Sequence, residues 1–101
     1  MRQNECYKGT ELKYLVNIQS PGFSMDDDNF EIVVKRGVVS RVFKKEDLSH
    51  RDDSYYLCFD SEEFGVGDAV AVAKAFVPDE DFADGFRTEV YKVQLVRILD
   101  I

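Results

Sequence analysis

Apolar and polar residues alternate with a period of two along several segments, which is the pattern of a half-buried β-strand. The clearest segment is 12–18, whose larger apolar residues share one face: Leu12, Tyr14, Val16 and Ile18. Four further segments predict strands, at 30–35, 38–43, 55–59 and 87–98. In the last of these the alternation slips at Val96, which predicts a β-bulge there.

Turn residues and runs of charge separate the predicted strands. Gly37 follows Arg36 between the second and third strands, and glycine admits the positive φ of a tight hairpin turn. Polar and acidic segments predict loops over 20–29, 44–54 and 78–86. Residues 61–64 predict a single helical turn, and the polar residues 1–10 predict a loosely held leader.

Residues 68–78 form the one segment that periodicity leaves open between helix and strand. Alanine is the best helix former and Pro78 would end a helix, so composition favours a helix. The alanines also fall on one face of a strand: Ala69, Ala71, Ala73 and Ala75. The opposite face would carry Val70, Val72 and Phe76. The length of the segment and the strands on both sides of it favour a strand.

Six or seven short strands, with at most one short helical turn, indicate an all-β fold. A chain of 101 residues, 45% of them hydrophobic, holds one globular domain with a core of its own. We therefore predict a flexible leader over residues 1–10 and a single antiparallel β-sandwich over residues 11–101. A partly open barrel is the alternative.

Charge and hydropathy narrow the classes of partner. Twenty acidic against thirteen basic residues give a net charge of −7, which repels a phosphate backbone. No apolar run approaches the roughly 18 residues of a membrane span, and the first five residues lack the apolar stretch of a secretory signal. We expect a protein that is cytoplasmic as synthesised and binds neither nucleic acid nor membrane.

The cysteines, the single histidine and the glycines form no catalytic or cofactor motif. Cys6 and Cys58 lack CxxC spacing, so both are expected to be reduced, with Cys58 acting as a small buried hydrophobe. His50 lies in a charged loop, where a solvated side chain is expected rather than the base of a nucleophile. Gly65 and Gly67 lead into a predicted strand, unlike a phosphate-binding loop. We expect no enzymatic activity, no bound metal and no cofactor.

Calcium is the one metal that the acidic loops could bind, because hard cations bind clustered oxygen atoms. The two loops concerned are 26–29 and 79–85. The second departs from an EF-hand loop at Ala83, which occupies a position that a ligand would need. Solvated acidic loops are therefore expected, and calcium binding is not.

Two sets of apolar residues are candidate interaction surfaces. The loop rim consists of four phenylalanines in predicted loops: Phe23, Phe64, Phe82 and Phe86. These either cap the open ends of the sandwich or form an exposed rim that binds a protein or a glycan. The second set, the alanine strip with its neighbour on the other face, consists of Ala69, Ala71, Ala73, Ala75 and Val72.

The alanine strip leads to one of two arrangements. Either tyrosine and phenylalanine side chains of a facing sheet fill the space above the alanines, and Val72 faces outward, or the strip is a flat surface for a neighbouring chain. Both arrangements leave an apolar face without cover inside the domain. We therefore expect self-association or docking through this strand.

Three stretches of strand and turn residues carry a resemblance to known proteins: Phe30–Gly37, Tyr55–Asp60 with Phe64-Gly65, and Val77–Val90. In these stretches the chain resembles small proteins encoded among tail genes in prophages of gut anaerobes. It resembles more distantly the N-terminal β-sandwich of phage baseplate upper proteins. The resemblance spans about residues 11–99 and implies a structural part that docks onto a tail or baseplate and becomes incorporated into a phage-like particle.

These observations together favour a non-enzymatic structural or adaptor module of a phage-like tail or baseplate assembly. Such a module acts through protein–protein contacts with itself or with other tail components. The alternative is a carbohydrate-binding β-sandwich module that uses the loop phenylalanines. The absence of tryptophan argues against this alternative, because flat indole rings are the usual platform for stacking sugars.

Overall fold

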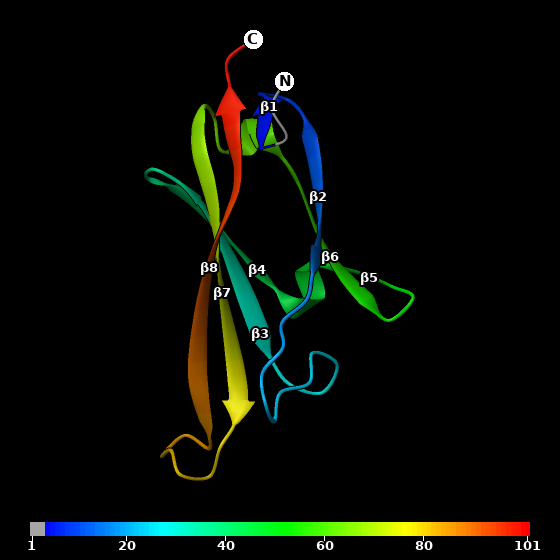
Figure 1. The fold of residues 1–101 in the computed structure, drawn as a ribbon, viewed down its shortest axis with the longest axis vertical. Helices are drawn as coiled ribbons and strands as arrows, with labels where there is room; N and C mark the ends of the chain where they lie inside the picture. Colours follow the sequence, from blue (N-terminus) through cyan, green and yellow to red (C-terminus); the bar gives the residue numbers. More distant parts are fainter. Residues whose placement is uncertain (1–3) are drawn as a thin grey trace.

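The computed structural model describes residues 4–101, which form eight β-strands and two short 3-10 turns (Figure 1). The strands are β1 (Glu5–Tyr7), β2 (Glu11–Val16), β3 (Phe30–Arg36), β4 (Val39–Lys44), β5 (Ser49–Arg51), β6 (Ser54–Asp60), β7 (Gly67–Pro78) and β8 (Phe86–Leu99). The 3-10 turns are η1 (Lys45–Asp47) and η2 (Ser61–Glu63). The all-β prediction is confirmed, and the ambiguous segment 68–78 belongs to strand β7. Within residues 4–101, no helix has the length and apolar character needed to cross a bilayer.

The strands form two sheets that enclose one hydrophobic core and do not close into a barrel. The larger sheet has five strands in the order β1-β8-β7-β3-β4, and the smaller has three in the order β2-β6-β5. All pairings are antiparallel except that of β1, which runs parallel to β8. The fold is therefore a sandwich with an unequal number of strands in its two layers.

The segment 4–10 differs from the expectation of a loosely held leader. Residues Glu5–Tyr7 pair with Arg97–Leu99, and the Arg97 amide donates a hydrogen bond of 2.8 Å to the Asn4 carbonyl. Cys6 is only 4% exposed and belongs to the core. A strand of three residues is too short to show a period in the sequence, and its partner lies at the other end of the chain. Residues 1–3 of the predicted leader lie outside the described part of the chain.

The predicted loop 44–54 contains both η1 and the short strand β5. Strand β5 pairs with β6 across a turn in which Asp52 and Asp53 have φ of 52° and 65°. Two consecutive residues in the left-handed region are the signature of a type I′ hairpin turn, and aspartate tolerates this conformation better than most residues. The two aspartates therefore form a hairpin where the charge run indicated only a loop.

The alanine side of β7 faces the smaller sheet. Ala69 and Ala75 are fully buried and Ala71 is 8% exposed. Large side chains that occupy the core include Phe43, Tyr55, Leu57, Phe59 and Phe64. The space above Ala69 and Ala75 is thus filled, because two sheets with bulky inner faces would leave no room for these rings, whereas Ala73 is only partly covered.

Candidate interaction surface

An apolar groove of about 500 Å³ lies between the two sheets on the side of β2 and β8. The residues of β2 that line it include Tyr14 and Val16, and those of β8 are Tyr91, Val93 and Leu95. Its remaining lining includes Ile32, Leu57, Ala71 and Ala73 from strands that also build the core. The small alanine side chains keep this part of the groove open.

The groove exists because the smaller sheet does not cover the whole of β8. At the C-terminal end of this strand Val96 and Ile98 are 8% and 0% exposed. In its middle Tyr91 and Val93, which pair with Ala73 and Ala71 and so share their face, are 38% and 55% exposed. Apolar side chains gathered in an open groove mark an interaction site more often than scattered ones do.

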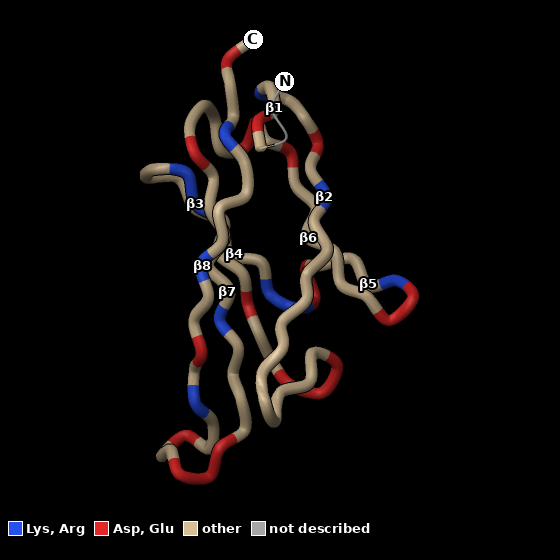
Figure 2. The backbone as a smooth tube through the Cα atoms, in the orientation of Figure 1, with Lys and Arg blue, Asp and Glu red and all other residues tan. Residues whose placement is uncertain are grey.

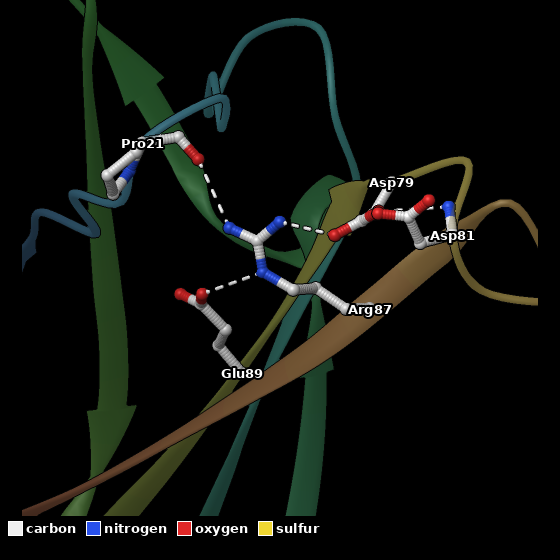
Figure 3. A network of polar contacts seen from close by, with 5 residues as sticks. All are labelled: Pro21, Asp79, Asp81, Arg87 and Glu89. Atoms are coloured by element: carbon white, nitrogen blue, oxygen red, sulfur yellow. Dashed lines mark hydrogen bonds and ion pairs between the residues drawn. The ribbon is translucent and has the colours of Figure 1, made fainter.

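A polar network around Arg87 holds the loops beside this groove (Figure 3). The guanidinium donates to Asp79 Oδ2 at 2.8 Å, to Glu89 Oε2 at 3.1 Å and to the Pro21 carbonyl at 3.3 Å. Asp79 also accepts a hydrogen bond from the Asp81 amide at 3.1 Å. One side chain thereby connects the β7–β8 loop, strand β8 and the loop before β3.

The carboxylates of this network have a lowered pKa. The pKa of Glu89 falls to about 2, first through a hydrogen bond with Ser20 and then through bonds with Tyr91 and Arg87. The pKa of Asp79 is lowered by the Asp81 amide and then by Arg87. Both groups therefore remain charged well below neutral pH, which keeps the Arg87 bridge intact.

We expect the Arg87 network to make the fold sensitive to acid below about pH 4.5. The Glu89 pKa lies lower in the folded state than its ordinary value of 4.5, so the unfolded chain takes up a proton first as the pH falls. The stabilising effect of Glu89 is present above this value and is lost toward pH 2. In E89Q the melting temperature should be lower at pH 7, and the gap to the wild type should narrow on acidification.

Thermal melts followed by circular dichroism between pH 2 and 7 measure this gap. Glu80→Gln, in the exposed part of the β7–β8 loop, is the matched control and should track the wild type at each pH. A gap between E89Q and the wild type that stays constant from pH 7 to pH 2 would contradict the role of the Glu89 carboxylate.

Two of the four loop phenylalanines are not part of an exposed rim. Phe64 is 1% exposed and packs edge-on against Phe59, with ring centroids 5.2 Å apart. Phe23 is half-buried and packs edge-on against Phe30. Both act as core or capping residues, because each finds an aromatic partner inside the sandwich. The rim of four residues is therefore not formed.

Phe82 and Phe86 are the exposed members of that set, at 51% and 38%. They lie at or beside the β7–β8 loop, and the Phe86 ring packs edge-on against Phe76 at 5.5 Å. Figure 2 shows that this loop, at the lower end of the view, is rich in acidic residues. Phe82 and Phe86 are therefore exposed apolar side chains at an acidic loop.

Only part of the alanine strip is accessible from outside the sandwich. Ala69 and Ala75 are fully buried, whereas Ala71 and Ala73 line the groove. Val72 lies on the outer face of the larger sheet, half-buried beside its register partners Val33 and Lys92. The residues that were predicted to form an interface on this strand therefore lie on two different faces of one sheet.

The prediction that Cys58 is buried is wrong. Strand β6 turns Tyr55, Leu57 and Phe59 inward, so Cys58 faces outward and is exposed, opposite Lys13 on β2. The alternation contained this information, but the apolar neighbours on both sides obscured it. Both cysteines are free.

The carboxylates of the loop at 26–29 accept hydrogen bonds from the protein itself. Asp28 accepts from the Ser24 amide at 2.8 Å, and Asp26 accepts from the Tyr55 hydroxyl at 3.0 Å. His50, in β5, stacks on the Tyr55 ring with centroids 4.1 Å apart and lies 3.8 Å from Asp26. Among the described residues no three histidine, cysteine, aspartate or glutamate side chains group as metal ligands would.

The groove residues Tyr14, Tyr91, Val93 and Leu95 were predicted only as strand residues. Their alternation placed them on inner faces, and no feature of the sequence indicated which inner residues a second sheet would leave uncovered. Comparison with protein-family models, with curated proteins and with solved structures finds no match for this chain.

Proposed function

We propose that this chain is a non-enzymatic adaptor module that binds an extended segment of a partner protein in the groove between β2 and β8. The observation that carries the proposal is the groove itself, with β2 as an edge strand beside it. A strand added alongside β2 would extend the smaller sheet and cover Tyr91 and Val93. Main-chain hydrogen bonds to an edge strand provide affinity in this mode of recognition, and pockets for alternate side chains provide specificity.

A phage-like tail or baseplate is the assembly that we propose for this adaptor. The support is the resemblance of three strand and turn segments to prophage tail proteins and to the N-terminal sandwich of baseplate upper proteins. A groove that takes up a neighbour's strand is well suited to a component that joins others without catalysing a reaction. Incorporation into a phage-like particle follows from the same proposal.

Co-expression with the proteins encoded by adjacent genes, followed by co-purification, tests this function. We expect one of these proteins to bind the wild-type chain and to bind Val93→Glu at least tenfold more weakly. A charge in the groove would be desolvated by the bound segment, and Val93 is exposed enough for the free protein to tolerate the change. The binding constant of the purified pair, measured by calorimetry, provides the comparison.

Val42→Glu is the matched control, because Val42 is 48% exposed and lies on β4, on the outer face of the larger sheet. This variant should bind the partner as the wild type does. Equal binding by Val93→Glu and the wild type would overturn the proposal. Retention of the chain on a polysaccharide, together with no binding to any of the neighbouring gene products, would favour the carbohydrate-binding alternative instead.

A further inference from the structure

Strand β8 is paired on only one side for most of its length. On one side it pairs with β7 from Phe86 to Ile98, and on the other β1 covers only Arg97–Leu99. Within residues 4–101, no strand lies against residues 86–95 on that second side. The larger sheet therefore ends in a free edge, along the outer side of β8 in Figure 1.

The backbone groups at this edge can be assigned from the register. The Phe76 amide donates a 3.0 Å hydrogen bond to the Asn29 carbonyl, on the β3 side of β7. In an antiparallel strand the N–H and C=O of one residue point to the same side, and those of the next residue point to the other side. The backbone groups of Ala75 therefore face its partner Glu89 on β8. On β8 the backbone groups of Glu89 therefore point toward β7, and every second residue points to the open edge. The residues whose N–H and C=O groups face the open edge are Thr88, Val90, Lys92 and Gln94.

Of the features that prevent strands from pairing, this edge has charged side chains, at Arg87, Glu89 and Lys92. Proteins protect edges with proline, bulges, very short strands or several charges. Residues 86–94 contain no proline and pair with β7 without a register shift, since the bulge comes at Leu95, between Gln94 and Val96. Val90, in the middle of the edge, is 59% exposed.

We propose that a second copy of this chain pairs with this edge, with β8 antiparallel to β8 and Val90 opposite Val90. A two-fold axis perpendicular to the sheet generates this pairing, so residues of the same face meet. Glu89 then lies opposite Tyr91, and Thr88 lies opposite Lys92. No two like charges face each other, whereas registers centred on Glu89 or on Lys92 would oppose like charges.

The proposed dimer goes beyond the adaptor function and uses a different edge of the sandwich. It extends the larger sheet to ten strands through β8, while the partner segment of the proposed function extends the smaller sheet through β2. The two-fold axis places both inner faces on one side, so the grooves of the two copies become neighbours. Each proposal can therefore fail without the other.

Sedimentation equilibrium of the full chain tests the dimer. We expect the wild type to have twice the 11.6 kDa of one chain at micromolar concentration. Val90→Lys and Val90→Glu should each raise the dimer dissociation constant at least tenfold, because each places two like charges together on the axis. An equimolar mixture of these two variants should recover the dimer, since lysine then lies opposite glutamate.

Two controls separate this interface from other surfaces. Val42→Lys places the same charge at the other edge of the sheet and should remain dimeric. Val93→Glu should also remain dimeric, because in this register residue 93 faces Arg87, and its loss of partner binding would then report on the groove alone. Melting curves show whether each variant is folded.

Three results would overturn the dimer proposal. These are a wild-type chain that stays monomeric at hundreds of micromolar, a folded Val90→Lys variant that dimerises like the wild type, and a mixture of the two Val90 variants that stays monomeric. A Val90→Glu variant that dimerises alone would overturn the proposed register. Such a dimer would indicate that the introduced glutamate lies opposite Lys92 of the other copy rather than opposite a second introduced glutamate.

Discussion

Ala75→Glu should leave the chain unfolded at 25 °C. Ala75 is fully buried, with Phe30 on β3 and Glu89 on β8 as its register partners. Its side chain points into the core. An unpaired carboxylate in such a place costs several kcal/mol, against a total stability of about 5–15 kcal/mol for a domain. The added side chain also needs volume that a close-packed core does not have.

Urea titration followed by circular dichroism measures this effect. Val42→Glu introduces the same side chain at a position that is 48% exposed and should change the free energy of unfolding by less than about 1 kcal/mol. A folded Ala75→Glu variant with near wild-type stability would mean that the alanine side of β7 faces solvent or a partner rather than the core.

Phe64→Ala should destabilise the fold by about 3–5 kcal/mol, the usual cost of removing a buried aromatic ring. Phe64 is 1% exposed and packs on Phe59, and its carbonyl accepts a 2.6 Å hydrogen bond from Arg36 Nε. For a domain of this size the loss corresponds to a fall in melting temperature of at least about 12 °C. Calorimetry measures both quantities.

Phe82→Ala is the control for this prediction, since the same truncation at a 51% exposed loop position should change stability by less than about 0.5 kcal/mol. The pair also separates the two interpretations of the loop phenylalanines. If both substitutions lower the free energy of unfolding by a similar small amount, Phe64 belongs to an exposed rim. A much larger loss for Phe64→Ala places Phe64 in the core.

The strands that alternation predicts are long, and each carries its period in several consecutive residues. Strand β3 covers the predicted 30–35 and adds one residue, and β8 covers the predicted 87–98 with its bulge one residue from Val96. Strands β1 and β5 have three residues each and could not be predicted this way. Their pairing with β8 and β6 gives them strand structure, and neither pairing leaves a local pattern.

The candidate surfaces were harder to predict than the fold. Burial of Phe64 depends on η2 bringing its ring toward Phe59, a contact that the turn residues around it do not reveal. Exposure of Val93 depends on the number of strands in the facing sheet. The burial of Phe64 and the exposure of Val93 both depend on how the two sheets and the adjoining turns overlap. Residues of similar hydropathy can therefore differ widely in exposure.

The sequence by itself determined the all-β class and the alternating faces of most of the longer strands. It favoured a sandwich over a partly open barrel, and a strand over a helix at 68–78. These follow from the period of two, because successive side chains of a strand point to opposite sides. Only the tertiary structure decided the division into sheets of five and three strands, and with it the groove beside β2 and the free edge of β8. The physical reason is that hydropathy specifies which face of a strand is apolar. Which other element covers that face depends on strand pairing between segments that are distant in the sequence.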